Sequence, residues 1–217
     1  MDIYPSIASS DPLIYGETLK SLGSWPFLHI DIEDGNFTPN ITFGLKTVEA
    51  ITNASMARHF SVHLMVTNPM DYIDELHKFG ADEIFSHIEA IENPDVFISR
   101  CHDLGIKAGL AIKANTQFSN LSKYIPKLDS ILFLTSCPTP IKEEFSPAAF
   151  NRALDVSLEL RGKVKMTADG GLGEEELKML AKNGFDSVVL GRLVFNCQNP
   201  LERLKVLTGI IGGNDNG

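Results

Sequence analysis

The sequence has few cysteines and few cations. Its three cysteines, Cys101, Cys137 and Cys197, are odd in number and form no Cys-x-x-Cys pair, which argues against a disulfide framework and a thiolate zinc site. The 19 lysines and arginines are outnumbered by 28 aspartates and glutamates, giving a formal net charge of −9. Because nucleic-acid affinity is carried largely by clustered cations, we expect no nucleic-acid partner.

The sequence also lacks a long apolar run. No uncharged apolar stretch reaches the roughly 18 residues of a membrane span, so we expect no membrane partner. The first residues, Met1 to Pro5, lack the basic segment and apolar run of a secretory signal, and we therefore expect a cytoplasmic protein. Hydrophobic residues make up 43% of the chain, which is enough to bury a sizeable core.

Short β-branched runs recur along the chain, separated by longer amphipathic stretches. Their recurrence about every 27 residues is typical of a strand, a loop and a helix per unit in a parallel sheet. Eight such units predict an α/β fold, a closed (β/α)8 TIM barrel, with an open doubly wound sheet as the structural alternative. The predicted strands are Ile3 to Ala8, Phe27 to Ile32, Phe60 to Met65, Glu83 to Ile88, Lys107 to Ile112, Ser130 to Thr135, Val164 to Ala168 and Ser187 to Leu190.

Helix signals fill the intervening segments. Asn-Pro pairs precede the predicted helices Met70 to Phe79 and Asp95 to Leu104, and a glycine precedes the helix Glu174 to Lys182. No linker or shift in composition interrupts the series, so we predict a single domain over residues 1–211. The polar, glycine-rich residues 212–217 are expected to form a flexible tail.

Ionisable residues lie at the carboxyl ends of several predicted strands, where a barrel carries its active site. His29 and Asp31 are two apart, so both side chains point to the same face of a strand. His63 ends the next strand and Asp169 ends the seventh. One such residue is more often a structural hydrogen-bonding group than a ligand, but two imidazoles and two carboxylates together suit a divalent metal ion.

Glycines follow the seventh and eighth strands, in Asp169-Gly170-Gly171 and Leu190-Gly191-Arg192. These are the two loops in which barrels commonly hold a phosphate, since glycine lets backbone amides approach an anion closely. Arg192 could add a charged fork to the phosphate oxygens. The structural alternative is a pair of tight turns followed by a surface arginine.

These segments resemble the ribulose-phosphate 3-epimerase family over nearly the whole chain. The second and third of the matching segments are specific to the family, and finding both in the right order by chance is improbable. The resemblance is carried by the segments Pro5-Ser6-Ile7-Ala8-Ser9, His29-Ile30-Asp31-Ile32-Glu33-Asp34-Gly35-Asn36-Phe37-Thr38-Pro39-Asn40, Val62-His63-Leu64-Met65, Ser86-His87-Ile88-Glu89 and Asp169-Gly170-Gly171.

The resemblance implies a metal-dependent 3-epimerase of a ketose phosphate, such as ribulose 5-phosphate and xylulose 5-phosphate or a related pentulose or hexulose phosphate. It implies one divalent ion, Zn, Fe, Mn or Co, held by His29, Asp31, His63 and Asp169, with Asp31 and Asp169 also moving the proton. A homo-oligomer is expected from the same resemblance. The implied substrate contacts are Ser6, Met65, Gly170, Gly171, Gly191 and Arg192.

That chemistry also follows a physical logic. Inverting a carbon beside a ketone requires one group to remove its proton and a second group to return one to the opposite face. A bound cation polarises the ketone and stabilises the enediolate that forms. Asp31 and Asp169 are expected on opposite sides of the barrel mouth, as this requires.

The chain departs from the family pattern around the expected sugar. Glu33 replaces a methionine, and Lys113 is a candidate cation to balance it. Residues Cys137 to Glu143, with Pro138 and Pro140, replace a glycine-rich loop, and the prolines should stiffen it. Two interpretations stay open: an epimerase with a different ketose phosphate, or a non-catalytic relative that binds sugar phosphates. Decarboxylase or aldolase chemistry ranks low, because the Asp-x-Lys-x-x-Asp run of such barrels has no lysine counterpart after Asp31.

Overall fold

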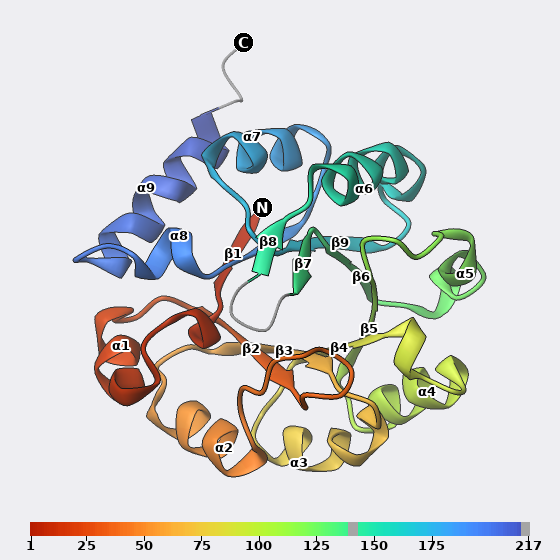
Figure 1. The fold of residues 1–217 in the computed structure, drawn as a ribbon, viewed down its shortest axis with the longest axis horizontal. Helices are drawn as coiled ribbons and strands as arrows, with labels where there is room; N and C mark the ends of the chain where they lie inside the picture. The colour runs from red at the N-terminus through yellow and green to blue at the C-terminus, as the bar shows by residue number, and fades with distance from the viewer. Residues whose placement is uncertain (139–142, 214–217) are drawn as a thin grey trace.

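The chain forms a barrel of eight parallel strands surrounded by helices (Figure 1). The computed structural model describes residues 1–138 and 143–213. The barrel and all eight predicted strands are confirmed, and the open doubly wound sheet is excluded. The strands are β1 (Asp2–Pro5), β2 (Phe27–Glu33), β3 (His59–Met65), β4 (Glu83–His87), β5 (Lys107–Ile112), β6 (Ser130–Leu134), β9 (Lys165–Asp169) and β10 (Ser187–Leu190).

The hydrogen-bonded ladder runs β1-β10-β9-β6-β5-β4-β3-β2, and the barrel closes where β1 meets β2. A parallel bridge between Ser6 and His29 joins these two strands. The first strand was expected to extend to Ala8, but it ends at Pro5 and a 3-10 helix occupies Ile7–Ser9. The chain therefore turns at the barrel mouth, directly beside His29.

The apolar core has two parts, because alternate residues of each strand point inward and outward. The outward side chains pack against the helices and form the larger cluster. A smaller cluster of Phe85, Ala111, Leu132 and Leu134 fills the barrel interior. Gly109 leaves room for it, because a β-carbon there would lie 2.3 Å from the Phe85 ring. The barrel is thus filled below the ionisable residues at its mouth.

Most of the helices lie in a ring outside the barrel (Figure 1). Asn93 caps α4 by accepting the backbone N–H of Asp95, and Ser146 caps α6 by accepting that of Ala149; each helix has a proline directly after its cap. Within the described residues, no helix is long and apolar enough to cross a membrane. The helices are α1 (Tyr15–Ser21), α2 (Leu45–Ala54), α3 (Ile73–Lys78), α4 (Pro94–Asp103), α5 (Ser119–Ser122), α6 (Pro147–Leu160), α7 (Glu174–Lys182), α8 (Arg192–Phe195) and α9 (Pro200–Gly212).

Two further segments differ from the sequence prediction. The helix expected from Met70 begins later, because a 3-10 turn (Pro69–Asp71) precedes α3. After β6 the chain forms a short antiparallel hairpin of β7 (Ser136–Pro138) and β8 (Glu143–Phe145), which was not predicted. The predicted stiffness was for the loop Cys137 to Glu143, whose residues 139–142 lie outside the described residues, as does most of the expected tail.

Candidate active site

Four ionisable side chains converge at the mouth of the barrel. Asp31 pairs with His63 in the register of β2 and β3, and His29 lies one inward position below Asp31. His63 Nδ1 is 3.4 Å from Asp31 Oδ1 and 3.2 Å from Asp169 Oδ2, and His29 Nε2 is 3.3 Å from Asp31 Oδ1. One ligand atom from each of the four residues lies within 4.8 Å of every other. The structure therefore brings together the four residues that the sequence predicted as metal ligands.

The donor set fits a divalent ion. Among the described residues, His29 Nε2 and Asp31 Oδ1 are fully buried and accept or donate no hydrogen bond. Buried polar atoms are costly without a partner, and a cation supplies one. Imidazole nitrogens and carboxylate oxygens are ligands that a divalent ion accepts, and one such atom from each of the four residues lies within reach of a shared ion. The opposite nitrogen of His29 is held by Ser61 Oγ at 2.7 Å, which fixes the ring.

The two carboxyl groups differ in their electrostatic surroundings. Burial alone would raise the pKa of Asp31, but the His29 and His63 imidazoles hold it well below its usual range. Burial and the nearby Asp31 carboxylate raise the pKa of Asp169. Burial opposes protonation of His63, yet contacts with Asp169 and Asp31 raise its pKa to about 9. The site thus favours one ionised acid and one more readily protonated acid.

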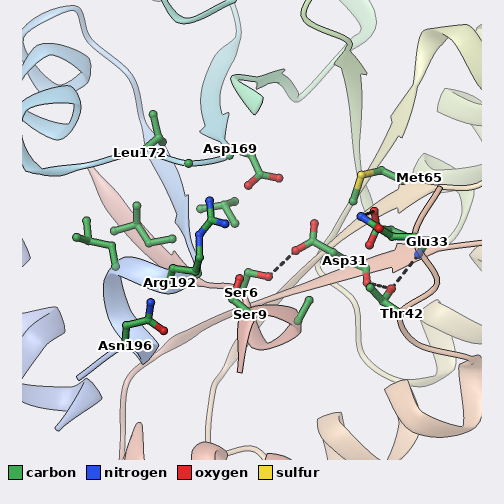
Figure 2. Close-up of a pocket in the computed structure, with 18 of the residues that line it drawn as sticks. Ser6, Ser9, Asp31, Glu33, Thr42, Met65, Asp169, Leu172, Arg192 and Asn196 are labelled. Atoms are coloured by element: carbon green, nitrogen blue, oxygen red, sulfur yellow. Dashed lines mark hydrogen bonds between the residues drawn. The ribbon is translucent and has the colours of Figure 1, made fainter. Parts of the chain in front are cut away.

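A cavity of about 1220 Å³ opens above the cluster, and every predicted substrate-binding residue lines it. Figure 2 shows Asp31 and Asp169 facing one another across this cavity, with Arg192 and Asn196 on one side and Glu33 and Met65 on the other. His29 and His63 lie beneath the cavity wall and are fully buried. The predicted contacts that line the cavity are Ser6, Met65, Gly170, Gly171, Gly191 and Arg192.

The glycine turns bring backbone close to this cavity. Gly170 and Gly171 have φ angles of 110° and 71°, which glycine adopts without strain. A β-carbon at Gly171 would lie 2.9 Å from Phe145 Cβ, because β8 packs against the turn. A β-carbon at Gly191 would lie 1.9 Å from Ser9 Oγ. Close packing therefore requires glycine in both loops.

A family model for the ribulose-phosphate 3 epimerase family matches residues 2–195. The chain belongs to this family. Membership confirms the predicted resemblance and the prediction of an epimerase-type enzyme. The ribulose-phosphate 3-epimerase of Chlamydia muridarum is 31% identical, with 99% of this chain and 96% of that protein covered. That of Schizosaccharomyces pombe is 32% identical, with 90% of this chain and 84% of that protein covered.

Solved structures with a similar fold are more distant in sequence. Orotidine 5'-monophosphate decarboxylase from Sulfolobus solfataricus matches with a TM-score of 0.67 at 12% identity, covering 97% of both chains. KGPDC from Streptococcus mutans matches with a TM-score of 0.71 at 11% identity, covering 97% of this chain and 96% of that one. At these identities the likeness concerns the barrel alone.

Glu33, where this epimerase-family chain departs from the expected methionine, lines the cavity beside Asp31. Burial and the Asp31 carboxylate raise its pKa. Its Oε1 accepts hydrogen bonds from Thr38 Oγ1 at 3.0 Å and Asn40 Nδ2 at 3.4 Å. Lys113 Nζ lies 3.6 Å from the centre of the Phe37 ring, and within the described residues no ion pair joins it to Glu33, so its role as a balancing cation stays a prediction. A hydroxyl and an amide group thus donate the hydrogen bonds that this carboxylate accepts.

A hydrogen-bonded chain behind the epimerase cluster joins two residues of the segment Ser86-His87-Ile88-Glu89, to which the sequence analysis assigned no role. His87 Nε2 lies 2.9 Å from His63 Nε2, and His87 Nδ1 lies 3.2 Å from Glu89 Oε2. The signal was present, since His87 and Glu89 are two apart at a strand end, as His29 and Asp31 are. Burial lowers the pKa of His87 to about 4. Burial opposes ionisation of Glu89, but hydrogen bonds from His87 and Thr116 lower its pKa to about 2.

Proposed function

We propose that this chain is a divalent-metal-dependent 3-epimerase of a ketose phosphate, interconverting ribulose 5-phosphate and xylulose 5-phosphate or a related pentulose or hexulose phosphate. The observation that supports it best is the shared cavity. It joins a buried two-histidine, two-aspartate cluster to two glycine turns and an arginine suited to a phosphate. Family membership supports the same class of reaction.

Different residues would bind the ion and the phosphate. His29, Asp31, His63 and Asp169 would hold the ion, through the atoms that already face one another. A bound divalent ion would polarise the ketone and make the C3 hydrogen acidic enough to remove. The glycine turns and Arg192 would hold the phosphate on their side of the cavity. The reacting carbons would then lie near Asp31 and Asp169, which face one another between Arg192 and Glu33 (Figure 2).

Asp31 and Asp169 would transfer the proton. The ionised carboxylate accepts the C3 proton from one face, which leaves an enediolate, and the protonated acid returns a proton to the opposite face. The lowered pKa of Asp31 and the raised pKa of Asp169 suit these two starting states. Ser6 Oγ donates a short hydrogen bond to Asp31 Oδ2 and so fixes the orientation of this carboxylate. The two acids exchange roles in the reverse reaction.

Glu33 restricts which sugar fits the cavity. Its carboxylate lies on the side away from Arg192, where the end of the sugar remote from the phosphate would lie (Figure 2). A carboxylate there accepts hydrogen bonds from hydroxyl groups and repels a second negative charge. We therefore propose that the substrate carries hydroxyl groups and no further anion at that end.

Deuterium exchange tests the proposal directly. The metal-loaded protein is incubated in deuterated water with a panel of pentulose and hexulose 5- and 6-phosphates, and incorporation at C3 is followed by NMR. We expect exchange with at least one member, its loss after treatment with a chelator, and its return when the ion is added back. Binding of the sugar phosphates without exchange, with metal content confirmed, would instead identify a non-catalytic relative.

A further inference from the structure

The histidine and glutamate behind the cluster have defined hydrogen-bonding roles. Glu89 Oε1 accepts the backbone N–H of Lys113 at 3.0 Å and a short hydrogen bond from Thr116 Oγ1. Its other oxygen, Oε2, faces His87 Nδ1. An ionised carboxylate can only accept hydrogen bonds, so the proton in this contact belongs to His87 Nδ1.

The proton on His87 Nδ1 determines which histidine supplies the proton between His87 and His63. His87 is fully buried and packs against the ring of Phe37, with ring centres 4.9 Å apart. A neutral imidazole suits these surroundings, and neutral His87 with its proton on Nδ1 has a bare Nε2. Only one hydrogen fits between the two Nε2 atoms of His87 and His63, so it must come from His63. The lone pair of neutral His63 then lies on Nδ1, which is the nitrogen that faces Asp31 and Asp169.

We propose that Glu89 and His87 are positioning residues that set the tautomer of His63, so that its Nδ1 lone pair points at the ion held by the cluster. This inference rests on the proposed function, because it assigns His63 to metal binding. Without the chain, His87 could carry its proton on Nε2 and donate to His63. The proton of His63 would then occupy Nδ1 and block the ligand position.

The parallel with His29 strengthens the assignment. His29 is anchored through Nδ1 to Ser61 and presents Nε2 to the cluster, whereas His63 is anchored through Nε2 to His87 and presents Nδ1. Each imidazole has one nitrogen held by a buried partner and the other facing the same point. A hydroxyl can either donate or accept, so the Ser61 contact leaves the tautomer of His29 adjustable. Of these two hydrogen-bonded arrangements, only the one through His87 ends in a group that cannot donate, the carboxylate of Glu89.

The first test needs no substitution. Nitrogen NMR of the zinc-loaded wild-type protein reports which ring nitrogen of each histidine carries hydrogen. We expect the hydrogen on Nε2 of His63 and on Nδ1 of His87. Hydrogen on Nε2 of His87 would overturn the inference. Failure to bind any divalent ion would overturn both this inference and the proposed function.

The second test measures zinc affinity by chelator competition. His87→Leu removes the acceptor and should weaken binding about 10–100-fold, as loss of an outer hydrogen-bond partner typically does. His87→Gln offers a carbonyl to His63 and should stay within about threefold of wild type. Glu89→Gln leaves one amide oxygen for three donors, so an intermediate loss is expected.

A surface histidine–carboxylate pair supplies the matched control. His102 Nε2 lies 2.8 Å from Asp129 Oδ2, and Asp129 directly precedes β6, at the opposite end of the strands from the cluster. His102→Gln should therefore leave zinc affinity unchanged. His87→Leu binding zinc as tightly as this control, or His87→Gln losing as much as His87→Leu, would contradict the inference. If the wild-type protein shows the expected tautomers and affinities but exchanges no ketose proton, the inference stands and the proposed function fails.

Discussion

The two sides of the cavity recognise their ligands by different means. On the cluster side the groups are buried side chains at strand ends, each oriented by a further partner such as Ser6, Ser61 or His87. On the other side they are backbone turns at glycines, together with the guanidinium of Arg192. The cluster side should be sensitive to substitutions that change charge or hydrogen bonding. The glycine turns should be sensitive to substitutions that add side-chain volume. Substitutions on the two sides should therefore affect different steps of the reaction.

The largest effect is expected from removing one proton-transfer group. Asp31→Asn and Asp169→Asn keep the side-chain shape but cannot accept or supply the proton, so kcat should fall about 10²–10⁴-fold. Metal content is measured alongside, since each change also removes a ligand charge. Asp74→Asn, at an exposed ion pair with Arg100, is the control and should keep full turnover. Wild-type kcat in either cluster variant would contradict the assigned roles.

A change of volume on the phosphate side should raise KM and leave zinc affinity intact. Gly191→Ala forces a β-carbon into Ser9, so the turn must shift, and KM should rise about 10–100-fold through misplacement of the substrate. Ser9→Gly removes the atoms in conflict, and the double variant should recover most of the loss. If zinc affinity fell together with substrate affinity, the two sides would not be separable.

Loss of the guanidinium should have a smaller effect on the same side. Arg192→Ser removes a charged hydrogen-bond donor, and KM for the phosphorylated substrate should rise about tenfold, or about 1.4 kcal/mol of binding. Inhibition by the corresponding unphosphorylated ketose should not change. Equal weakening for both compounds would show that Arg192 does not recognise the phosphate. Arg100→Gln at the surface is the matched control.

The smallest effect is expected on stability, at Asp34 in the turn after β2, which accepts hydrogen bonds from Thr67 after β3. Hydrogen bonds from the Phe37, Thr67 and Asn36 amides hold the pKa of Asp34 well below its usual range, although slight burial opposes this. Because its folded pKa is lowered, its contribution is present above the unfolded pKa of about 3.9 and is lost as pH falls through the folded value. Asp34→Asn should cost about 1 kcal/mol at pH 7, the modest value expected for an exposed group. Urea unfolding should show that the difference in unfolding free energy between wild type and Asp34→Asn is smaller at pH 3 than at pH 7. The kcat of the variant should stay unchanged.

Most of the fold and the metal-ligand cluster could be predicted from the sequence, for identifiable reasons. Apolar runs such as Lys107–Ile112 are confirmed as strands because they are buried on both faces. His29 and Asp31 could be placed on one face because strand alternation is strict. The contact between His63 and His87 was not predictable in the same way. It depends on how far two side chains reach across neighbouring strands, since the register places Phe85, and not His87, beside His63.

Other features lay beyond sequence reasoning. The hairpin of β7 and β8 forms in a segment with prolines, where strand signals are weak. The partners of Glu33 come from the turn after β2, and their approach depends on the path of that turn. Arg192 was placed correctly at the cavity, because its loop follows a strand that must end at the barrel mouth.

The separation of the ligands along the chain has a consequence for thermal stability. His63 and Asp169 are 106 residues apart, so the complete set exists only when early and late strands are assembled in one barrel. An ion that needs all four side chains has far less affinity for the unfolded polypeptide, and mass action then favours the assembled state. At free zinc concentrations a hundred times the dissociation constant this amounts to about 2.7 kcal/mol, so the melting temperature of the protein should rise as zinc is added.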